Sequence, residues 1–301
     1  MSTIVTLVPY DPAWPAQFAL IRNELTAALG DAAVSIEHVG STSVPGLAAK
    51  PVIDVDVVIR PGTFPNVRMR LEAASYRHAG DQGISGREVF KCADQRGLSK
   101  HHLYVCSYDA AELWRHITFR NAMRRRPELA DAYARVKTEG ARLFPDRMDA
   151  YIAHKGRFIQ SVYHSHGLQY RYEFNAPISP AALADLRQAV GWNHMERDLA
   201  DPRLRNAFHL CAWDGERLIG YAAVVSNGVT DAYIQDVMVH PDCQKQGVGT
   251  QLMERVLARL KAEGLYMVSV IYGDEALRPF YEKFGFYTML CGQREMRPGQ
   301  D

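Results

Sequence analysis

The chain has 301 residues and nearly balanced charge, with 35 Lys and Arg against 34 Asp and Glu. This length predicts two domains, and the charge balance excludes the strongly basic surface of a dedicated nucleic-acid-binding protein. Five widely spaced cysteines without a C-x-x-C pair indicate reduced thiols, which excludes a disulfide framework and a cysteine-based zinc site. Because no apolar run is long enough to cross a bilayer and no signal segment opens the chain, we expect a cytoplasmic protein without membrane contacts.

The first half opens with a proline-rich segment at residues 9–15. Apolar side chains then recur every three or four residues from Phe18 to Leu29, which predicts an amphipathic helix ending at Gly30. The alternation over residues 34–39 predicts a strand. A second, β-branched strand follows and carries Asp54 and Asp56.

The alternation around Asp54 and Asp56 places both carboxylates on one face of that strand. Two adjacent carboxylates repel each other unless a cation or a positive group lies between them, so the pair indicates a divalent metal such as Mg2+. The Gly40–Ser41 turn upstream could hold a phosphate through its backbone. In the basic helix at 115–126, Arg120 and Arg124 share one side, where they either face phosphates or form part of a solvated surface.

These features resemble the G-S…D-x-D signature of the nucleotidyltransferase fold. A closer resemblance is to the GrpB family of nucleotidyltransferase-like domains, over residues 4 to about 164. It rests on the segments YDPAWP (10–15), GSTSVPGLAAKP (40–51), GREVFK (86–91), HLYV (102–105), FRNAMR (119–124), PELADAY (127–133) and KGRFI (155–159). The resemblance implies a mixed sheet with helices and a site for a nucleotide and Mg2+. The implied nucleotide-site residues are Gly40, Ser41, Asp54, Asp56, Arg120 and Lys155, with Asp54 and Asp56 as metal ligands.

Catalytic nucleotidyltransferases place a third carboxylate on a later strand, where this chain offers His102 and Tyr104. GrpB members also tend to read H-L-H-V and F-R-D at the HLYV and FRNAMR segments. These departures argue against two-metal phosphoryl transfer. The aspartate pair is then either a working nucleotide or metal site or an inactive, inherited one. We expect His38, His116 and His154 to be hydrogen-bonded structural residues.

The second half begins after a helix at 149–163, so we expect domains at 1–167 and 168–301. A strand at 170–174 precedes a helix capped by Ser179, and Asp214–Gly215 predicts a hairpin between strands at 208–213 and 217–225. The further predicted elements are a strand from 233, a helix from 248, a strand at 266–271, a helix at 276–283 and a last strand from Phe286.

The segment QKQGVG at 244–249 connects the strand from 233 to the helix from 248. The first amides of a helix lack partners within it, its dipole favours negative charge, and glycines allow a ligand to approach closely. A diphosphate fits such a turn. The segment resembles the acetyl-coenzyme A signature Q/R-x-x-G-x-G/A of the GNAT superfamily of N-acetyltransferases. FYEKFGF at 280–286 is similar to that family's Y-x-x-x-G-F element, and the resemblance covers residues 170–297.

The GNAT resemblance implies roles for individual residues. Tyr281 would be the general acid that reprotonates the leaving thiolate, and Asp236 on the central strand the general base; His240 and Glu275 are weaker candidates. A structural carboxylate at Asp236 is nearly as plausible. Members often carry Asn where this chain has Gly273. The implied coenzyme-binding residues are Val237, Met238, Val239, Gln244, Lys245, Gln246, Gly247, Val248, Gly249, Thr250 and Asp274.

Together these patterns predict an α/β (α+β) chain. Its N-terminal half would be a nucleotidyltransferase-like mixed sheet with helices, and its C-terminal half a mixed, mostly antiparallel GNAT sheet flanked by helices. The predicted function is acetyl-CoA-dependent acetylation of a primary amine of a small molecule, such as an aminoglycoside-like compound or a polyamine, by direct transfer in a ternary complex. The alternative is a nucleotide- or RNA-end-binding protein whose GNAT half is regulatory. The GNAT resemblance also implies a possible homodimer.

Overall fold

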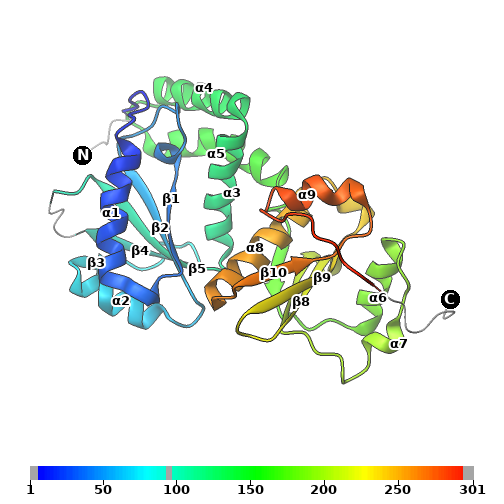
Figure 1. Cartoon of the computed structure of the whole chain (residues 1–301). Coiled ribbons are helices and arrows are strands. Elements are labelled where there is room, and N and C mark those ends of the chain that lie inside the picture. The colour runs from blue at the N-terminus through cyan, green and yellow to red at the C-terminus, as the bar shows by residue number, and fades with distance from the viewer. Residues whose placement is uncertain (1–5, 93–96, 294–301) are drawn as a thin grey trace. The chain divides into compact units, whose positions relative to one another are not determined.

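The computed structural model describes residues 6–92 and 97–293. The chain divides into two compact units, Met1–Ser165 and His166–Asp301, each built on one five-stranded sheet with helices (Figure 1). This arrangement confirms the expected mixed α/β class. The domain boundary expected after residue 167 stays a prediction. Among the described residues, no helix combines the length and apolar character needed to cross a membrane.

The N-terminal unit has the sheet order β1-β2-β5-β4-β3, in which β2 and β5 are parallel and the other neighbours antiparallel. Its strands are β1 (Ser35–Val39), β2 (Ile53–Ile59), β3 (Tyr76–His78), β4 (Arg87–Cys92) and β5 (His101–Ser107). Its helices are α1 (Trp14–Leu29), α2 (Phe64–Ala73), α3 (Ala111–Arg125), α4 (Pro127–Leu143) and α5 (Met148–His164), with 3-10 turns η1 (Gly30–Ala32) and η2 (Ser41–Ser43).

The two faces of this sheet differ in character. On one face, Val55 and Val57 of β2 are fully buried in an apolar core with α1 and α2. The other face carries Asp54 and Asp56 and is covered by α3, which lies across the sheet from α1 (Figure 1). The strand alternation that the sequence shows therefore separates a hydrophobic side from a charged side.

The C-terminal unit has the sheet order β10-β9-β8-β7-β6. Its strands are β6 (Arg171–Phe174), β7 (Phe208–Asp214), β8 (Arg217–Ser226), β9 (Asp231–Val239) and β10 (Met267–Val270). Its helices are α6 (Pro180–Ala189), α7 (Glu196–Leu199), α8 (Val248–Glu263) and α9 (Arg278–Glu282), with 3-10 turns η3 (Pro241–Cys243) and η4 (Glu275–Leu277). Neighbouring strands are antiparallel except for the parallel pair β9–β10.

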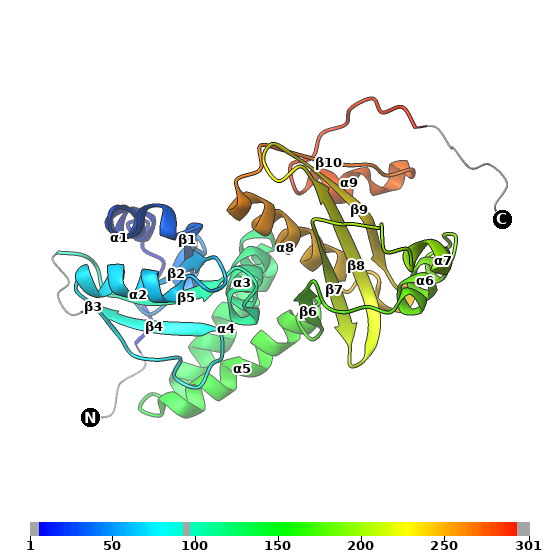
Figure 2. The same cartoon turned by 90° about the horizontal axis from the view of Figure 1, so that it is seen from below.

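Helices α8 and α6 cover opposite faces of the C-terminal sheet (Figure 2). Leu252, Val256 and Leu260 of α8 are buried in one apolar cluster, which confirms the stripe expected from their spacing. Ser179 caps α6 by accepting a hydrogen bond from the Ala182 amide, also as expected.

The last expected strand, from Phe286, is wrong over the described residues: residues 286–293 form no strand. Beyond Phe286, the side chains of Tyr287, Met289 and Leu290 are exposed, so their packing does not favour a strand over coil. The remainder of that prediction, residues 294–301, lies outside the described residues.

Candidate active site

The first feature of the site is a bulge in β9. Asp236 has a positive φ of 52°, and the pairing of β9 with β8 shifts register at this point, between Tyr221 and Ala223. On its other side, β9 pairs with β10 only as far as Ile234. Residues 235–239 therefore have no neighbouring strand on the β10 side within the described chain, and a gap opens between the two strands.

The second feature is the corner at which β9 turns through η3 into α8. In the described structure, the backbone amides of residues 245–250 donate no hydrogen bond, and no side chain caps α8. The amide of Gln251 is the first to enter the helix, bonding the Gly247 carbonyl at 3.0 Å. Consecutive unpaired amides at the positive end of a long helix form a binding site for an anion.

Packing within the C-terminal unit requires a glycine at 247 and leaves little room for a side chain at 249. Gly247 has a φ of 90°, and a Cβ added there would lie 2.5 Å from the carbonyl carbon of His166. At Gly249, an added Cβ would lie 3.3 Å from the ring of Phe280. The sequence predicts that glycines stand here so that a ligand can approach the backbone. The structure adds a second reason, because the connecting segment before β6 packs against the corner at Gly247.

Polar side chains fix the shape of this turn. Gln244 donates to the Val239 carbonyl at 3.0 Å, and Gln246 donates to the Asp242 carbonyl while accepting from the Tyr170 hydroxyl at 2.8 Å. Both glutamines therefore support the loop through hydrogen bonds to its backbone, although Gln244 is exposed.

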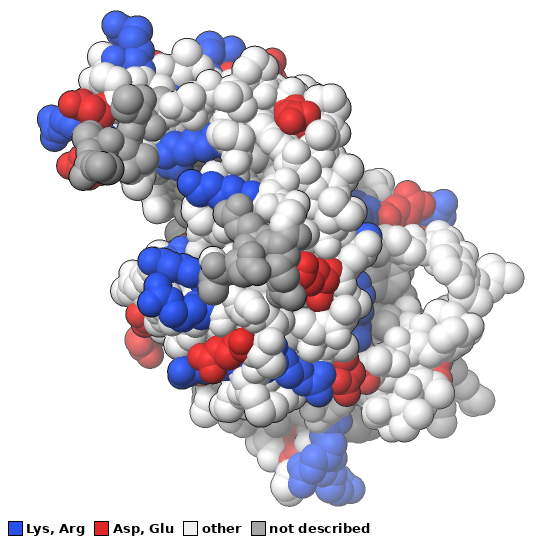
Figure 3. Space-filling model, turned by 90° about the vertical axis from the view of Figure 1, so that its left-hand side faces the viewer, with Lys and Arg blue, Asp and Glu red and all other residues white. Residues whose placement is uncertain are grey.

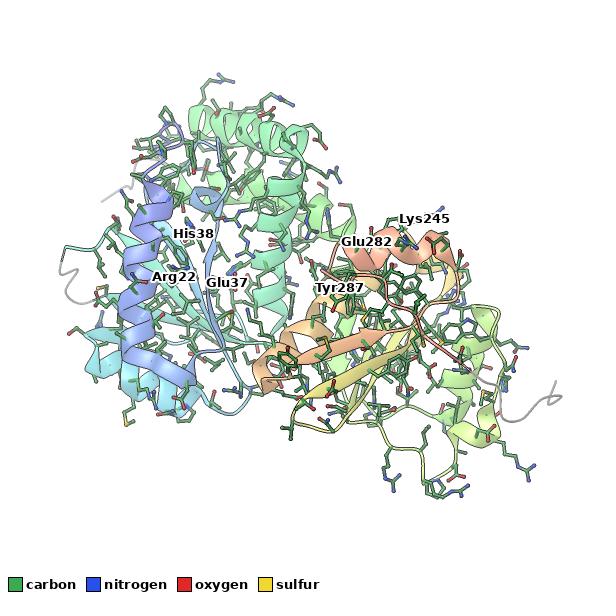
Figure 4. The ribbon with its side chains drawn as sticks, viewed as in Figure 1. Arg22, Glu37, His38, Lys245, Glu282 and Tyr287 are labelled. Carbon is green, nitrogen blue, oxygen red and sulfur yellow. The ribbon has the colours of Figure 1, made fainter. Side chains whose placement is uncertain are left out.

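Two ammonium groups lie at the corner. Lys245 is exposed and adopts a positive φ of 61° (Figure 4). Lys283 donates to the Thr250 hydroxyl at 2.8 Å and lies 4.3 Å from the centre of the Phe280 ring. Sequence reasoning missed Lys283, because only the packing of α9 on α8 brings it to this turn. The two lysines add positive charge to that of the helix end.

Tyr281 lies in the apolar cluster next to the corner. Its ring stacks on Tyr272 at 4.8 Å and meets Phe280 and Phe286 edge to face. Burial raises the pKa of the Tyr281 phenol to about 12, with a smaller effect from Tyr233. The phenol is therefore protonated at neutral pH, which is the form that a general acid needs.

Asp236, the expected base, lies at the bulge. Its Oδ1 accepts a hydrogen bond from Arg187 of α6 at 3.1 Å, and Arg187 also donates to the Asn193 carbonyl. The ion pair is partly buried, which holds the carboxylate in place beside the gap. The other expected polar residues have local partners: Asp274 caps η4 through the Ala276 amide.

His240 and Glu275 also form local contacts. The Nδ1 atom of His240 accepts from the Asp242 amide, and Glu275 pairs with Arg278 at 2.5 Å. Both side chains thus have structural partners on the surface of the C-terminal unit.

In the N-terminal unit, each aspartate of the pair contacts a histidine. Asp56 is fully buried, and both its oxygens contact Nδ1 of His116, at 2.9 and 3.2 Å. Nε2 of His116 lies 3.4 Å from Glu112. Burial alone would lower the pKa of His116, but Asp56 and Glu112 outweigh it and raise the pKa to about 10. Asp54 pairs with His102 at 3.0 Å.

These contacts leave no place for the expected metal. Asp56 is closed off by an imidazolium, and the described residues contain no group of three or more acidic, His or Cys side chains that could hold an ion. Glu37, which neighbours Asp56 on β1, pairs with Arg120 at 2.8 Å. The Mg2+ site predicted from the sequence is therefore not supported: each aspartate contacts its own histidine, Asp56 with His116 and Asp54 with His102.

The remaining residues of the expected nucleotide site lie around η2. Gly40 packs directly against Asp54, so that an added Cβ would overlap the carboxylate. Ser41 accepts from Lys137, a residue that the sequence did not indicate. Arg120 also donates to the His38 carbonyl, and Figure 4 shows Glu37 and His38 together on β1. The expectation that His38 and His116 are hydrogen-bonded is confirmed. For His154 it is wrong, because its buried Nε2 has no hydrogen-bond partner among the described residues and lies 3.8 Å from Glu139.

The described residues on the face shown in Figure 3 form no continuous basic surface. On the face shown in Figure 3, the described basic and acidic side chains are interspersed, and uncharged surface separates them. Binding to a nucleic acid backbone requires a continuous basic surface. The mixed charge of this face agrees with the nearly equal numbers of basic and acidic residues in the whole chain.

Comparisons with known proteins bear on both units. The model of the GrpB protein family matches residues 4–165, more than half of the chain. The chain belongs to the GrpB family. UPF0157 protein YqkA from Bacillus subtilis (strain 168) is 31% identical to this GrpB protein over 161 residues, which cover 52% of this chain and 46% of that protein. UPF0157 protein PA4798 from Pseudomonas aeruginosa is 34% identical over 161 residues, and 66% of it is covered.

The chain thus spans less than two thirds of either relative. A crystal structure of GrpB from Enterococcus faecalis shares 32% identity with a TM-score of 0.46, covering 52% of this chain and 96% of that one.

The second half of this GrpB protein is a GNAT domain, since the Acetyltransferase (GNAT) family model matches residues 161–286. Uncharacterized N-acetyltransferase ycf52 from Gracilaria tenuistipitata var. liui is 30% identical over 128 residues, covering 41% of this chain and 70% of that protein. A Staphylococcus aureus protein of unknown function, described as a probable acetyltransferase, is 26% identical with a TM-score of 0.39, covering 42% of this chain and 98% of that one. The family model and the ycf52 relative support acetyltransfer as the general activity.

Proposed function

We propose that the GNAT domain transfers an acetyl group from acetyl-coenzyme A to a primary amine of a small molecule, by direct attack in a ternary complex. The observation that carries this proposal is the run of unpaired amides at residues 245–250, beside the unpaired end of β9. Acetyl-coenzyme A, when bound, supplies the acetyl group as an activated thioester. The family implies this donor, and the orphaned donors of the corner fit its diphosphate.

The binding residues divide between the corner and the strand. We assign the diphosphate to the amides of residues 245–250, with Lys245 and Lys283 adding charge at the rim. Residues 237–239 of β9 face the gap left by β10 and would hold the rest of the coenzyme along their backbone. Gln244 and Gln246 shape the loop through the contacts described above.

Tyr281 and Asp236 take the two proton-transfer roles in this proposal. Tyr281 holds its proton on the phenol oxygen at neutral pH and would deliver it to the departing thiolate. The acceptor amine is protonated at that pH and must lose a proton before it attacks. Asp236 is the candidate base: its Oδ1 is bonded to Arg187, while its Oδ2 accepts no hydrogen bond in the described structure.

The acceptor is the least specified part of the proposal. Loop carboxylates would favour a polycationic acceptor such as an aminoglycoside or polyamine, but Asp201 is already paired with Arg203. This ion pair reduces the negative charge that Asp201 can offer to an acceptor. We therefore propose a primary amine as the acceptor class, and aminoglycosides and polyamines as the first compounds to assay.

The test is a panel of amines assayed for free thiol release, alongside calorimetric titration with acetyl-coenzyme A. We expect saturable binding of the donor and thiol release with at least one amine, and we expect Tyr281→Phe to slow that release by about 100-fold or more without affecting donor binding. Absence of saturable donor binding would overturn the proposal. A nucleotide- or RNA-end-binding function with a regulatory GNAT domain is not favoured, because the acidic pair is closed by histidines.

A further inference from the structure

Arg187 of α6 connects the proposed base to the loop that follows this helix. Its side chain is 13% exposed, and each of its three nitrogens donates a hydrogen bond. Nη1 donates to Oδ1 of Asp236 at 3.1 Å, Nε to the Asn193 carbonyl at 3.0 Å, and Nη2 to the Met195 sulfur at 3.4 Å. The guanidinium carbon also lies 5.3 Å from the centre of the Trp192 ring. Because its planar donors are all engaged, the side chain is held in one geometry.

Asp236 needs such support, because its backbone is in a sparsely populated conformation. Its φ of 52° lies in the left-handed region, at the point where the pairing of β9 with β8 changes register. A bulge turns the side chain of the bulged residue away from the direction that a regular strand would give it. A residue other than glycine keeps such a conformation only where its surroundings fix it. The ion pair with Arg187 supplies a fixing contact from a separate element.

The distance that this ion pair spans along the chain sets it apart. Most ion pairs described in the C-terminal unit join residues within four positions of each other, as Arg259 and Glu263 do on α8. Arg187 and Asp236 lie 49 positions apart. A pair within one helix stabilises that helix. The pair between Arg187 and Asp236 instead fixes the bulge of β9 relative to α6, and so determines where the carboxylate lies.

The hydrogen bond leaves the two carboxylate oxygens of Asp236 in different states. Oδ1 accepts from Arg187, whereas Oδ2 accepts no hydrogen bond in the described structure. In the proposed reaction, one N–H bond of the acceptor ammonium breaks, its electron pair stays on the nitrogen, and the proton adds to Oδ2. The neutral amine then attacks the thioester carbonyl. A carboxylate that rotates freely presents its oxygens in many directions, so holding Oδ1 favours the productive one.

We propose that Arg187 is a positioning residue for acetyl transfer: it holds the Asp236 carboxylate by Oδ1, so that Oδ2 takes the proton of the acceptor, and it ties this base to the loop at residues 191–195. This inference rests on the function proposed above. Arg187 acts through Asp236 and has no part in donor binding, so its loss should slow the transfer step without weakening the binding of acetyl-coenzyme A. Because the same guanidinium also bonds the loop, a change at Asp236 should alter the surroundings of Met195.

The test is a double-mutant cycle on thiol release by the full chain, with aminoglycosides and polyamines as acceptors. Arg187→Gln should lower kcat by about tenfold or more at an unchanged KM for acetyl-coenzyme A, as expected for a misplaced catalytic group. In the Asp236→Asn background, the same substitution should change kcat by less than about twofold, because the group that Arg187 positions is already lost. The matched control is Arg259→Gln, which should retain the wild-type kcat. Arg259 is similarly buried, pairs with Glu263 and lies 3.9 Å from the centre of the Phe208 ring.

The methyl group of Met195 gives a second readout that needs no turnover, because its sulfur contacts Arg187. In the full chain labelled with 13C-methyl methionine, Asp236→Asn should shift the Met195 resonance. Arg187→Gln should remove this effect, since the guanidinium that contacts both residues is then absent. Melting curves verify that each variant is folded. Arg187→Lys replaces a glutamine variant that does not fold, with the same expected pattern, because an ammonium lacks the planar donors of arginine.

The outcomes separate this inference from the proposed function. An unchanged kcat for Arg187→Gln, an equal slowing in both backgrounds, or a Met195 resonance that Asp236→Asn leaves in place would overturn the inference alone, as long as the wild type releases thiol. A wild-type chain that releases no thiol with any amine would overturn both.

Discussion

Gly247→Ala tests whether the corner is held by packing or kept open for a ligand. The added Cβ would lie 2.5, 2.7 and 2.8 Å from the carbonyl carbon, Cα and oxygen of His166. The residue would also adopt a φ of 90°, which side chains disfavour. Backbone atoms cannot move aside as a flexible side chain does, so the connecting segment or the first turn of α8 must shift.

The magnitude follows from two contributions. A left-handed conformation costs a non-glycine residue about 1–2 kcal/mol, and overpacking a well-packed site costs about 1–3 kcal/mol. Gly247→Ala should therefore lower the free energy of unfolding of the C-terminal unit by about 2–5 kcal/mol. Gly249→Ala is the matched control, since Gly249 has no positive φ and the nearest atom to its added Cβ belongs to the Phe280 ring at 3.3 Å. Its cost should be below about 1 kcal/mol, because alanine also favours the helix.

Hydrogen exchange of the α8 amides, followed by mass spectrometry, measures this difference for the C-terminal unit alone. We expect clearly faster exchange for Gly247→Ala and near wild-type exchange for Gly249→Ala. Equal exchange in the two variants would refute the packing argument. If both variants instead lose affinity for acetyl-coenzyme A while the hydrogen exchange of α8 is unchanged, close approach of the ligand is the main reason for both glycines.

Three further predictions concern charge and proton transfer. Tyr281→Phe should reduce thiol release by about 100-fold or more at an unchanged melting temperature, because its stacking on Tyr272 remains; an unchanged rate would exclude it as the acid. Lys245→Glu should weaken acetyl-coenzyme A binding by roughly fivefold and reduce its salt dependence in calorimetric titration, with Lys261→Glu as the control; equal effects would contradict a role at the corner. The raised pKa of His116 stabilises the fold fully below pH 6.5, and this contribution is lost as the pH rises towards 10, at up to about 1.4 kcal/mol per pH unit. Urea denaturation should show that decline for the wild type and a flatter profile for His116→Gln; identical profiles would count against the buried ion pair.

Much of the fold could be predicted from the sequence, because local patterns record which face of an element is buried. The spacing of Leu252, Val256 and Leu260 predicted the buried face of α8, and Ser179 predicted the start of α6. The alternation around Asp54 and Asp56 correctly separated a charged face from an apolar one. The strand expected from Phe286 failed, since a run of apolar residues does not show whether a neighbouring strand is available to pair with it.

The sequence by itself determined the two sheets with their flanking helices, and the position of the glycine corner between a strand and a helix. Only the tertiary structure decided what those residues contact. Residues distant in sequence meet there: His116 closes Asp56, His166 packs on Gly247, and Lys137 reaches Ser41. The periodicity of a segment shows which face of one helix or strand is buried. The partner of a charged side chain depends instead on how separate elements pack. For this reason the metal site predicted at Asp56 is an ion pair with His116 in the structure.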